Sequence, residues 1–349
     1  MNLDALLERA EALIAIPSTA DRPADLARAL DLVLDVVGPG FAVRRFESRG
    51  KPSALVTTEP GRLDARVILN GHLDVVPGTP DQFVPVNDGT RLHGRGAQDM
   101  KVAALVLATV FREMAPILPY PLALQLVCDE EVGGFDGTAH QIEQGVTAGF
   151  VVIGEQSGLR VVTESKGLLQ VRLRATGRAA HAAYPWLGDN ALTKVTRAVE
   201  AILARYPVPS REEWVTTVNV ARIATGNAAV NQVPADATAW LDVRFPPEDG
   251  RTGEQIAADL EEEGVTVTID SVAPPHHADP ECDEVRLLNQ GELLRKHGAA
   301  DGRFYSARGI NAVIFGPGGD GQHGPAEYLD IATVEPYYRA LREFLTRVS

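Results

Sequence analysis

The chain has 349 residues, of which 45% are hydrophobic and 23% charged, a composition typical of a globular protein with room for two domains. Its 33 basic and 47 acidic residues give a formal net charge of -14. The basic residues form no long block, which argues against a nucleic-acid or anionic membrane surface. Two cysteines, Cys128 and Cys282, are too few for a disulfide framework and favour a reducing compartment. With no signal-peptide pattern and no long apolar run, the sequence predicts a cytoplasmic protein that does not enter a membrane.

Four apolar, strand-like segments each lead directly into acids, a histidine or glycines. Continuous apolar runs of this length are typical of buried strands in a parallel sheet, and ligands of such sheets gather at the carboxyl ends of the strands. The sequence therefore predicts that these polar residues meet at one edge of a sheet. The segments are residues 67–69 before Gly71-His72-Leu73-Asp74, residues 122–127 before Asp129-Glu130-Glu131, residues 150–153 before Gly154-Glu155, and residues 313–315 before the glycine-rich stretch that precedes His323.

The order of expected elements indicates an α/β domain that is interrupted by an insertion. Residues 1 to about 160 alternate helical and strand-like patterns, with a buried helix over residues 101–114 and Asp99 at or near its N-cap. Residues 167–272 follow a βαββαβ order that is typical of a ferredoxin-like α+β domain. Its expected elements are strands 168–175, 214–223, 238–245 and 265–272, and helices 190–205 and 254–263.

The α/β pattern resumes after Pro274-Pro275, which marks a linker. We therefore predict a discontinuous catalytic domain, residues 1–166 and 273–349, and an inserted domain, residues 167–272. His276 and His277 stand beside the linker and are expected to be solvated.

The residues at the predicted sheet edge suit a site for two divalent metal ions. In His72-Leu73-Asp74 the first and third side chains point the same way in extended backbone, so Asp74 can fix the tautomer of His72. Asp99 follows a glycine-rich turn, where a carboxylate could bridge two cations. Glu130 and Glu131 are consecutive, so one can bind metal while the other points elsewhere, and Glu155 and His323 supply two more ligands. Each of these motifs alone is more often an ordinary strand end, turn or helix start; their common placement favours the metal site.

Taken together, these motifs resemble the M20 family of metal-dependent amidohydrolases and peptidases, which includes acetylornithine deacetylase and succinyl-diaminopimelate desuccinylase. The similarity extends in order over the whole chain. The matching motifs are Gly71-His72-Leu73-Asp74-Val75-Val76-Pro77, Gly94-Arg95-Gly96-Ala97-Gln98-Asp99-Met100-Lys101, Asp129-Glu130-Glu131, Gly154-Glu155 and, in the insertion, Gly177-Arg178-Ala179-Ala180-His181-Ala182-Ala183-Tyr184-Pro185.

The resemblance implies a zinc-exopeptidase-like catalytic domain and a role for each motif. It implies that His72 and Glu155 hold one zinc ion, that Glu131 and His323 hold the other, and that Asp99 bridges both. Glu130 is then the general base and Asp74 orients His72. His181 donates a hydrogen bond to the oxyanion, often from the partner subunit of a homodimer formed by the inserted lid domain. Asn231 and Arg244 match positions that grip the substrate, and an arginine fork suits a carboxylate.

The function that follows is hydrolysis of the amide bond in a small N-acyl amino acid by a di-metal enzyme, with zinc or cobalt as cofactor. Within the family, a glutamate at the position of Glu155 is typical of deacylases and carboxypeptidase-like members, whereas aspartate is typical of aminopeptidases and dipeptidases. A dipeptidase or carboxypeptidase with the same machinery is the alternative. A non-catalytic metal-binding interaction protein is a third reading, disfavoured because such proteins lose ligands or the base.

Overall fold

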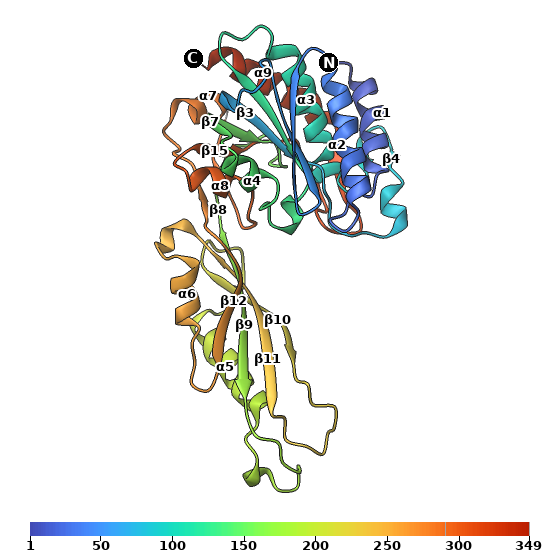
Figure 1. Ribbon diagram of the computed structural model, residues 1–349. Helices are drawn as coiled ribbons and strands as arrows, with labels where there is room; N and C mark the ends of the chain where they lie inside the picture. Colours follow the sequence, from blue (N-terminus) through green and yellow to red (C-terminus); the bar gives the residue numbers. More distant parts are fainter. Residues whose placement is uncertain (290, 349) are drawn as a thin grey trace. The chain divides into compact units, whose positions relative to one another are not determined.

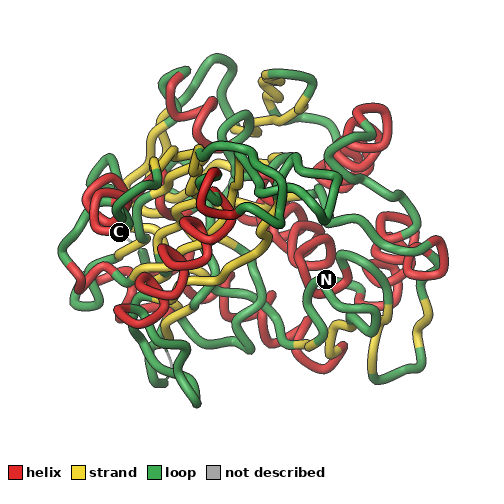
Figure 2. Tube along the Cα trace, turned by 90° about the horizontal axis from the view of Figure 1, so that it is seen from below, coloured by secondary structure: helices red, strands yellow, loops and turns green. Residues whose placement is uncertain are grey.

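The computed structural model describes residues 1–289 and 291–348, which form two compact units (Figure 1). The first unit comprises Met1–Thr163, His277–Arg295 and Ala300–Ser349, and the second Glu164–His276 and Lys296–Ala299. The chain therefore leaves the first unit after Thr163 and returns to it at His277. Long loops connect several helices and strands of the chain (Figure 2).

The first unit is built on a mixed sheet whose strand order is β1-β2-β6-β3-β7-β15-β8-β13, with β14 beside β8. The four predicted apolar segments are adjacent in it: β6, β3, β7 and β15 are mutually parallel. This confirms the parallel sheet that the apolar runs predict. The strands are β1 (Ala42–Ser48), β2 (Lys51–Thr57), β3 (Asp64–His72), β6 (Leu122–Val127), β7 (Thr147–Ile153), β8 (Val162–Ser165), β13 (His276–His277), β14 (Leu294–Lys296) and β15 (Asn311–Ile314).

Helices cover both faces of this sheet, because alternate strand residues face opposite sides. Val67 and Leu69 belong to one hydrophobic core and Ile68 to the other. The first core includes α1 (Leu3–Ile14), α2 (Pro23–Val37), α3 (Val102–Met114), α7 (Asp283–Leu288) and α9 (Val334–Arg347), and the second includes residues of α4 (Thr138–Glu143) and α8 (Gly302–Ser306). Figure 1 shows α1, α2 and α3 side by side.

A small antiparallel sheet, in the order β16-β17-β5-β4, lies in the same unit. It joins the segment before Asp99 to the segment around His323, which are more than 200 residues apart. Its strands are β4 (Val86–Asn87), β5 (Arg91–His93), β16 (Gly319–Asp320) and β17 (Tyr328–Asp330).

The second unit has the predicted ferredoxin-like arrangement. Its antiparallel strands lie in the order β10-β11-β9-β12, which places the first and third strands of the βαββαβ sequence in the middle. Its elements are β9 (Gly167–Thr176), α5 (Ala191–Arg205), β10 (Thr217–Ala224), β11 (Asp236–Phe245), α6 (Gly253–Asp259) and β12 (Thr266–Ala273). The side chain of Asn190 caps α5 by accepting from Thr193 N at 3.1 Å, and Thr252 and Gln255 form a capping box at α6.

Asp99 lies near the N-cap of α3, as expected: it is two residues before the N-cap Lys101, in an irregular helical turn, η2 (Ala97–Lys101), where its own backbone is non-helical. Two other local expectations were wrong. Helix α6 ends at Asp259 rather than Glu263. His276 is fully buried rather than solvated, because the chain after Pro274-Pro275 enters the main sheet at once as β13 instead of crossing solvent.

Every helix in the described part of the chain is too short or too polar to cross a membrane.

Candidate metal centre

The four parallel strands end close to one another along the strand direction, which brings together the polar residues at and just after their ends. His72 at the end of β3 pairs with Val127 at the end of β6. Ile153 at the end of β7 pairs with Asn70 of β3 and with Ile314 of β15. The residues that follow these strands therefore leave the sheet from one edge, as expected for the ligand-binding edge of an α/β sheet.

Gly154 shows why a glycine precedes Glu155 at this edge. A Cβ atom on Gly154 would lie 2.8 Å from the hydroxyl of Tyr337 and 2.9 Å from the side chain of Leu107. Helices α3 and α9 thus approach the strand end too closely for any side chain. Glycine at this position lets the helices cover the strand while Glu155 turns into the site.

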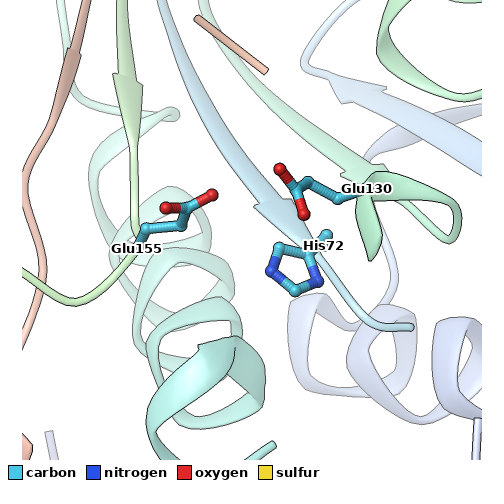
Figure 3. A group of neighbouring side chains, drawn as sticks. All are labelled: His72, Glu130 and Glu155. Atoms are coloured by element: carbon cyan, nitrogen blue, oxygen red, sulfur yellow. The ribbon is translucent and has the colours of Figure 1, made fainter. Parts of the chain in front are cut away.

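One group of potential ligands consists of His72, Glu130 and Glu155. Each offers a ligand atom, and these atoms all lie within 4.8 Å of one another. Figure 3 shows the imidazole and the two carboxylates turned toward a common space, each side chain coming from the end of a different strand. His72 and Glu155 are buried, and Glu130 is half-buried.

A second group consists of Asp99, Glu131 and His323, whose ligand atoms also lie within 4.8 Å of one another. The Nε2 atom of His323 is 3.0 Å from Glu131 Oε2 and 3.3 Å from Asp99 Oδ2. His323 has a left-handed backbone, with φ 60°, a conformation that is uncommon outside glycine but enriched at functional sites.

Asp99 connects the two groups. Its Oδ1 atom is 2.9 Å from His72 Nε2, and its Oδ2 atom is 3.3 Å from His323 Nε2. One carboxylate therefore presents one oxygen to each group, which is the arrangement that a bridging ligand requires. The side-chain amide of Gln322 also donates to Asp99 Oδ2.

Asp74 is completely buried and serves both groups. The Nδ1 atom of His72 is 3.1 Å from the carbonyl oxygen of Asp74 and 3.5 Å from its carboxylate. The carboxylate accepts hydrogen bonds from the backbone amides of Glu130, at 3.2 Å, and Glu131, at 2.9 Å. Asp74 thus contacts His72 largely through its backbone and fixes the Glu130-Glu131 turn with its side chain, a contact that sequence reasoning did not find.

The electrostatics of the centre reflect many acids in a small volume. Burial raises the pKa of Glu130 well above its ordinary value, and the nearby Glu155 raises it further. Burial also raises the pKa of Glu131. Burial alone would lower the pKa of His72, but hydrogen bonds to Asp74 and Asp99 outweigh it and raise that pKa. Hydrogen bonds to Asp99 and Glu131 raise the pKa of His323 to about 10.

The donor set fits two divalent cations. Two imidazoles and three carboxylates, those of Asp99, Glu131 and Glu155, are the nitrogen and oxygen ligands that zinc and similar ions take. Buried carboxylates this close repel one another unless cations or protons neutralise them. Two divalent cations would balance the negative charges of these three carboxylates and of Glu130. Acids of this centre raise the pKa values of His72 and His323, which means that they stabilise positive charge at this place.

Sequence reasoning missed Glu327, which is buried and holds the turn that carries Asp99. It accepts hydrogen bonds from Arg95 and from three backbone amides of this turn. Its local sequence, Gly324-Pro325-Ala326-Glu327, reads as an exposed loop with one acid. Only the pairing of β17 with β5 brings it to the site, and no local pattern signals that pairing.

The other three predicted site residues, His181, Asn231 and Arg244, belong to the second unit. His181 and Asn231 lie on neighbouring segments, where Ala182 N donates to Asn231 O at 2.8 Å. His181 Nδ1 accepts from Ala183 N at 3.1 Å, so in the neutral ring Nε2 carries the proton and is a donor. Arg244 lies apart from them on β11, where its fork binds Asp242 with contacts of 2.6 and 3.2 Å.

Comparison with known proteins agrees with this geometry. A model of peptidase family M20/M25/M40 matches residues 68–347. A succinyl-diaminopimelate desuccinylase of Sphingopyxis alaskensis is 32% identical over 74% of this chain and 72% of its own length. A probable carboxypeptidase of Aspergillus terreus is also 32% identical, over 80% of this chain and 70% of its own length. A putative succinyl-diaminopimelate desuccinylase of Mycobacterium tuberculosis is 29% identical over 97% of both chains.

Solved structures share the fold. A tripeptidase of Staphylococcus aureus covers all of this chain and 99% of its own with a TM-score of 0.78 at 19% identity. An M20 family metallo-carboxypeptidase of Sulfolobus solfataricus covers 98% of this chain and 99% of its own, also with a TM-score of 0.78, at 17% identity.

The fold and the paired ligand groups are those of a metal-dependent hydrolase. The chain belongs to peptidase family M20/M25/M40 and is an enzyme that acts on amide bonds.

Proposed function

We propose that this enzyme hydrolyses the amide bond of a small N-acyl amino acid, with two zinc ions as cofactor and cobalt as a functional substitute. His72 and Glu155 would hold one ion, Glu131 and His323 the other, and Asp99 both. The observation that carries the proposal is the division of Asp99 between the two ligand groups, with one oxygen toward each histidine.

Bound divalent ions would supply the positive charge that polarises the substrate carbonyl and makes water more acidic. The residues of the chain would then handle protons and position. Glu130 stands with its carboxylate turned toward His72 and Glu155 (Figure 3), where it would accept the proton of the attacking water and pass it to the departing amine.

The second unit would supply the remaining contacts. The protonated Nε2 of His181 would donate to the oxyanion of the tetrahedral intermediate. Asn231 and Arg244 would bind the substrate, with the guanidinium of Arg244 exchanging Asp242 for the substrate carboxylate. We also propose that this unit acts as a lid, that its edge strand β10 joins two chains into a homodimer, and that the enzyme works in the cytoplasm.

A peptidase with the same machinery is the second candidate, favoured by the 32% identity to a probable carboxypeptidase. Its chemistry at the metal centre would be unchanged. The difference would lie in whether an acyl group or an aminoacyl group occupies the acyl side of the scissile bond.

The test is amine release by the zinc- or cobalt-loaded protein from one panel of N-acetyl, N-succinyl and N-carbamoyl amino acids and dipeptides. Turnover confined to the N-acyl amino acids would support the deacylase. Turnover confined to dipeptides would replace it by the peptidase. No turnover of either group by protein with two bound metals per chain would reject both.

A further inference from the structure

Glu327 is a buried side chain, 3% exposed. Both of its carboxylate oxygens accept hydrogen bonds from the turn before α3. Its Oε1 atom accepts from the backbone amides of Gly96, at 2.9 Å, Gln98, at 3.1 Å, and Asp99, at 3.2 Å. Its Oε2 atom accepts from Arg95 Nη1 at 2.7 Å. Charge-assisted hydrogen bonds of this kind are stronger than neutral ones, so this one side chain fixes the backbone of the proposed bridging ligand.

Arg95 extends the same connection to the other ligand segment. Its Nη2 atom donates to the carbonyl oxygen of His323 at 3.2 Å, and the guanidinium is buried with Glu327. The backbone supports the pair, because Gly94 N donates to Glu327 O at 3.1 Å and β17 pairs with β5. Asp99 and His323 are therefore tied together through two charged side chains, neither of which is a proposed ligand.

We propose that Arg95 and Glu327 are positioning residues that set the spacing of Asp99 and His323 for metal binding. The inference rests on the proposed metal site and concerns how tightly that site binds. Outer partners of metal ligands commonly change metal affinity by about 10–100-fold when they are replaced.

The test is Glu327→Gln in the full-length protein, with metal affinity measured by titrating Co²⁺ and recording its visible absorption. The amide keeps the shape of the side chain but turns one acceptor into a donor that faces backbone amides or Arg95. We expect Co²⁺ affinity to fall at least tenfold, and Glu327→Asp, which keeps the charge, to recover part of it. Wild-type affinity in Glu327→Gln would overturn the proposal.

Two further variants guard this test. Glu335→Gln on α9 is the matched control, because that carboxylate is exposed and pairs with an exposed neighbour, Arg339; the variant should bind Co²⁺ like the wild type. If Glu327→Gln does not fold, Arg95→Lys is the second variant. A lysine keeps a positive charge next to Glu327, but its single ammonium group cannot also donate to the carbonyl oxygen of His323, as the second nitrogen of the Arg95 fork does. A folded Arg95→Lys protein with unchanged affinity would also overturn the proposal. This test measures Co²⁺ binding, whereas the test of the proposed function measures turnover. A negative result in one can therefore be told apart from a negative result in the other.

A second, independent feature is a cavity of about 450 Å³ in the first unit, next to Glu131. Its walls are largely apolar, with Val75, Val76, Pro77, Phe83 and Val132 among the residues that line it. It therefore adjoins a proposed metal ligand, where the scissile bond of a substrate would lie.

Three polar groups that line this cavity already have partners within the chain. The hydroxyl of Thr19 donates to Asp21 at 2.5 Å, and the carbonyl of Ala20 accepts from Lys51. The guanidinium of Arg22 pairs with Asp25 through Nε at 2.8 Å, and its side chain is 52% exposed. The charged groups that line the cavity are therefore two carboxylates, those of Asp21 and Glu131, and one guanidinium that already has an acidic partner; most of the remaining lining is apolar.

We infer that this cavity receives an uncharged, apolar group of the substrate, either a large aliphatic or aromatic amino-acid side chain or an apolar acyl chain. The inference rests on the proposed function and names its substrate class. A succinyl group, which ends in a carboxylate, would be a poorer occupant, because its charge would lose water beside the carboxylates of Asp21 and Glu131, and the guanidinium of Arg22 in the same lining already pairs with Asp25.

The test compares kcat/KM for two series in the wild type and Phe83→Ala: N-acetyl derivatives of glycine, leucine and phenylalanine, and glycine with acetyl, hexanoyl or succinyl groups. Removing a large apolar contact should lower the preference for the apolar member over N-acetylglycine at least tenfold, consistent with roughly 1.5–3 kcal/mol for burying such a side chain. The series that changes identifies which group enters the cavity.

Val84→Ala is the matched control, because this neighbouring residue is 65% exposed and should leave the preference unchanged. An unchanged preference in Phe83→Ala, or a wild-type preference for the succinyl substrate, would reject the inference while leaving the proposed function intact. Failure to hydrolyse any member of either series would reject the proposed function instead.

Discussion

Glu130 and Glu131 are adjacent acids with different surroundings. Glu131 is within 3.1 Å of His323 in the group that contains Asp99, whereas Glu130 faces His72 and Glu155. The carboxylate of Asp74 accepts from both backbone amides and so fixes this division. Two identical side chains can thus take different roles, one as ligand and one as proton carrier.

We expect Glu130→Gln to lower kcat by about a thousandfold, since general-base catalysis contributes about 10²–10⁴-fold, while two metal ions per chain remain. Metal content by atomic spectroscopy and turnover of the best panel substrate would check this. Glu131→Gln is the comparison variant and should lose one metal ion per chain. Loss of a metal ion from Glu130→Gln would show that Glu130 is itself a ligand.

At the residue scale, the sequence could predict the acids and histidines that follow an apolar strand, because strand ends of one parallel sheet converge. It could not predict Glu327, whose partners are more than 220 residues away and lie on a turn. Nor could it predict the burial of His276, because Pro274-Pro275 suggests a linker whether the chain then crosses solvent or joins a sheet.

The elements around the centre were more predictable than their ends. Continuous apolar runs over β6 and β7 and the apolar helix α3 carry their own signals; β6 and α3 are buried almost throughout, and β7 is buried over its last four residues. The irregular turn η2 was not predictable, because its shape depends on hydrogen bonds from Gly96, Gln98 and Asp99 to the distant Glu327. The local sequence is thus enough to predict the regular helices and strands, whereas the conformation of this turn depends on contacts with a residue far away in the sequence.

One ion pair joins an element before the insertion to an element after it. Arg66 on β3 lies 2.5 Å from Glu284 on α7. Burial alone would raise the pKa of Glu284, but hydrogen bonding to Arg66 outweighs it, and the pKa is lowered. A lowered carboxyl pKa in the folded state means that the pair stabilises the fold above the ordinary glutamate pKa and that this stabilisation is lost as the pH falls.

We therefore expect Glu284→Gln to lower the free energy of unfolding at pH 7 by about 1 kcal/mol, the range of a partly exposed pair. The difference from the wild type should shrink as the pH falls through the folded-state pKa of Glu284. Urea unfolding at several pH values would measure it. A difference that stays constant with pH would mean that the pair acts by packing rather than by charge.

On the scale of the whole molecule, the proposed metal ions would bind ligands drawn from five separate segments of the chain and neutralise the acids among them. Their removal should therefore loosen the first unit as well as abolish activity, because a ligand that binds only the folded state stabilises it. We expect a chelator to lower the midpoint of thermal unfolding and excess Zn²⁺ to restore it, measured by calorimetry. An unchanged midpoint after verified metal removal would contradict the proposed site.

The proposed homodimer makes a separate prediction. If His181 acts on the partner's metal centre, mixed dimers of Glu130→Ala and His181→Ala chains should regain part of the activity that each variant lacks, because one of the two sites is then intact. Affinity purification with two different tags would isolate the mixed dimers before assay. Inactive mixed dimers would instead indicate a site completed within one chain.

The return of the chain to the first unit has a consequence for biosynthesis. Four of the five proposed ligands, His72, Asp99, Glu131 and Glu155, precede the inserted unit, and His323 follows it in the last strand region. A ribosome therefore finishes the whole ferredoxin-like unit before it delivers the fifth ligand and the nearby Glu327. Polypeptides that stop short of residue 323 would lack a complete centre however well their early strands fold, so premature termination would yield inert protein rather than an unregulated hydrolase.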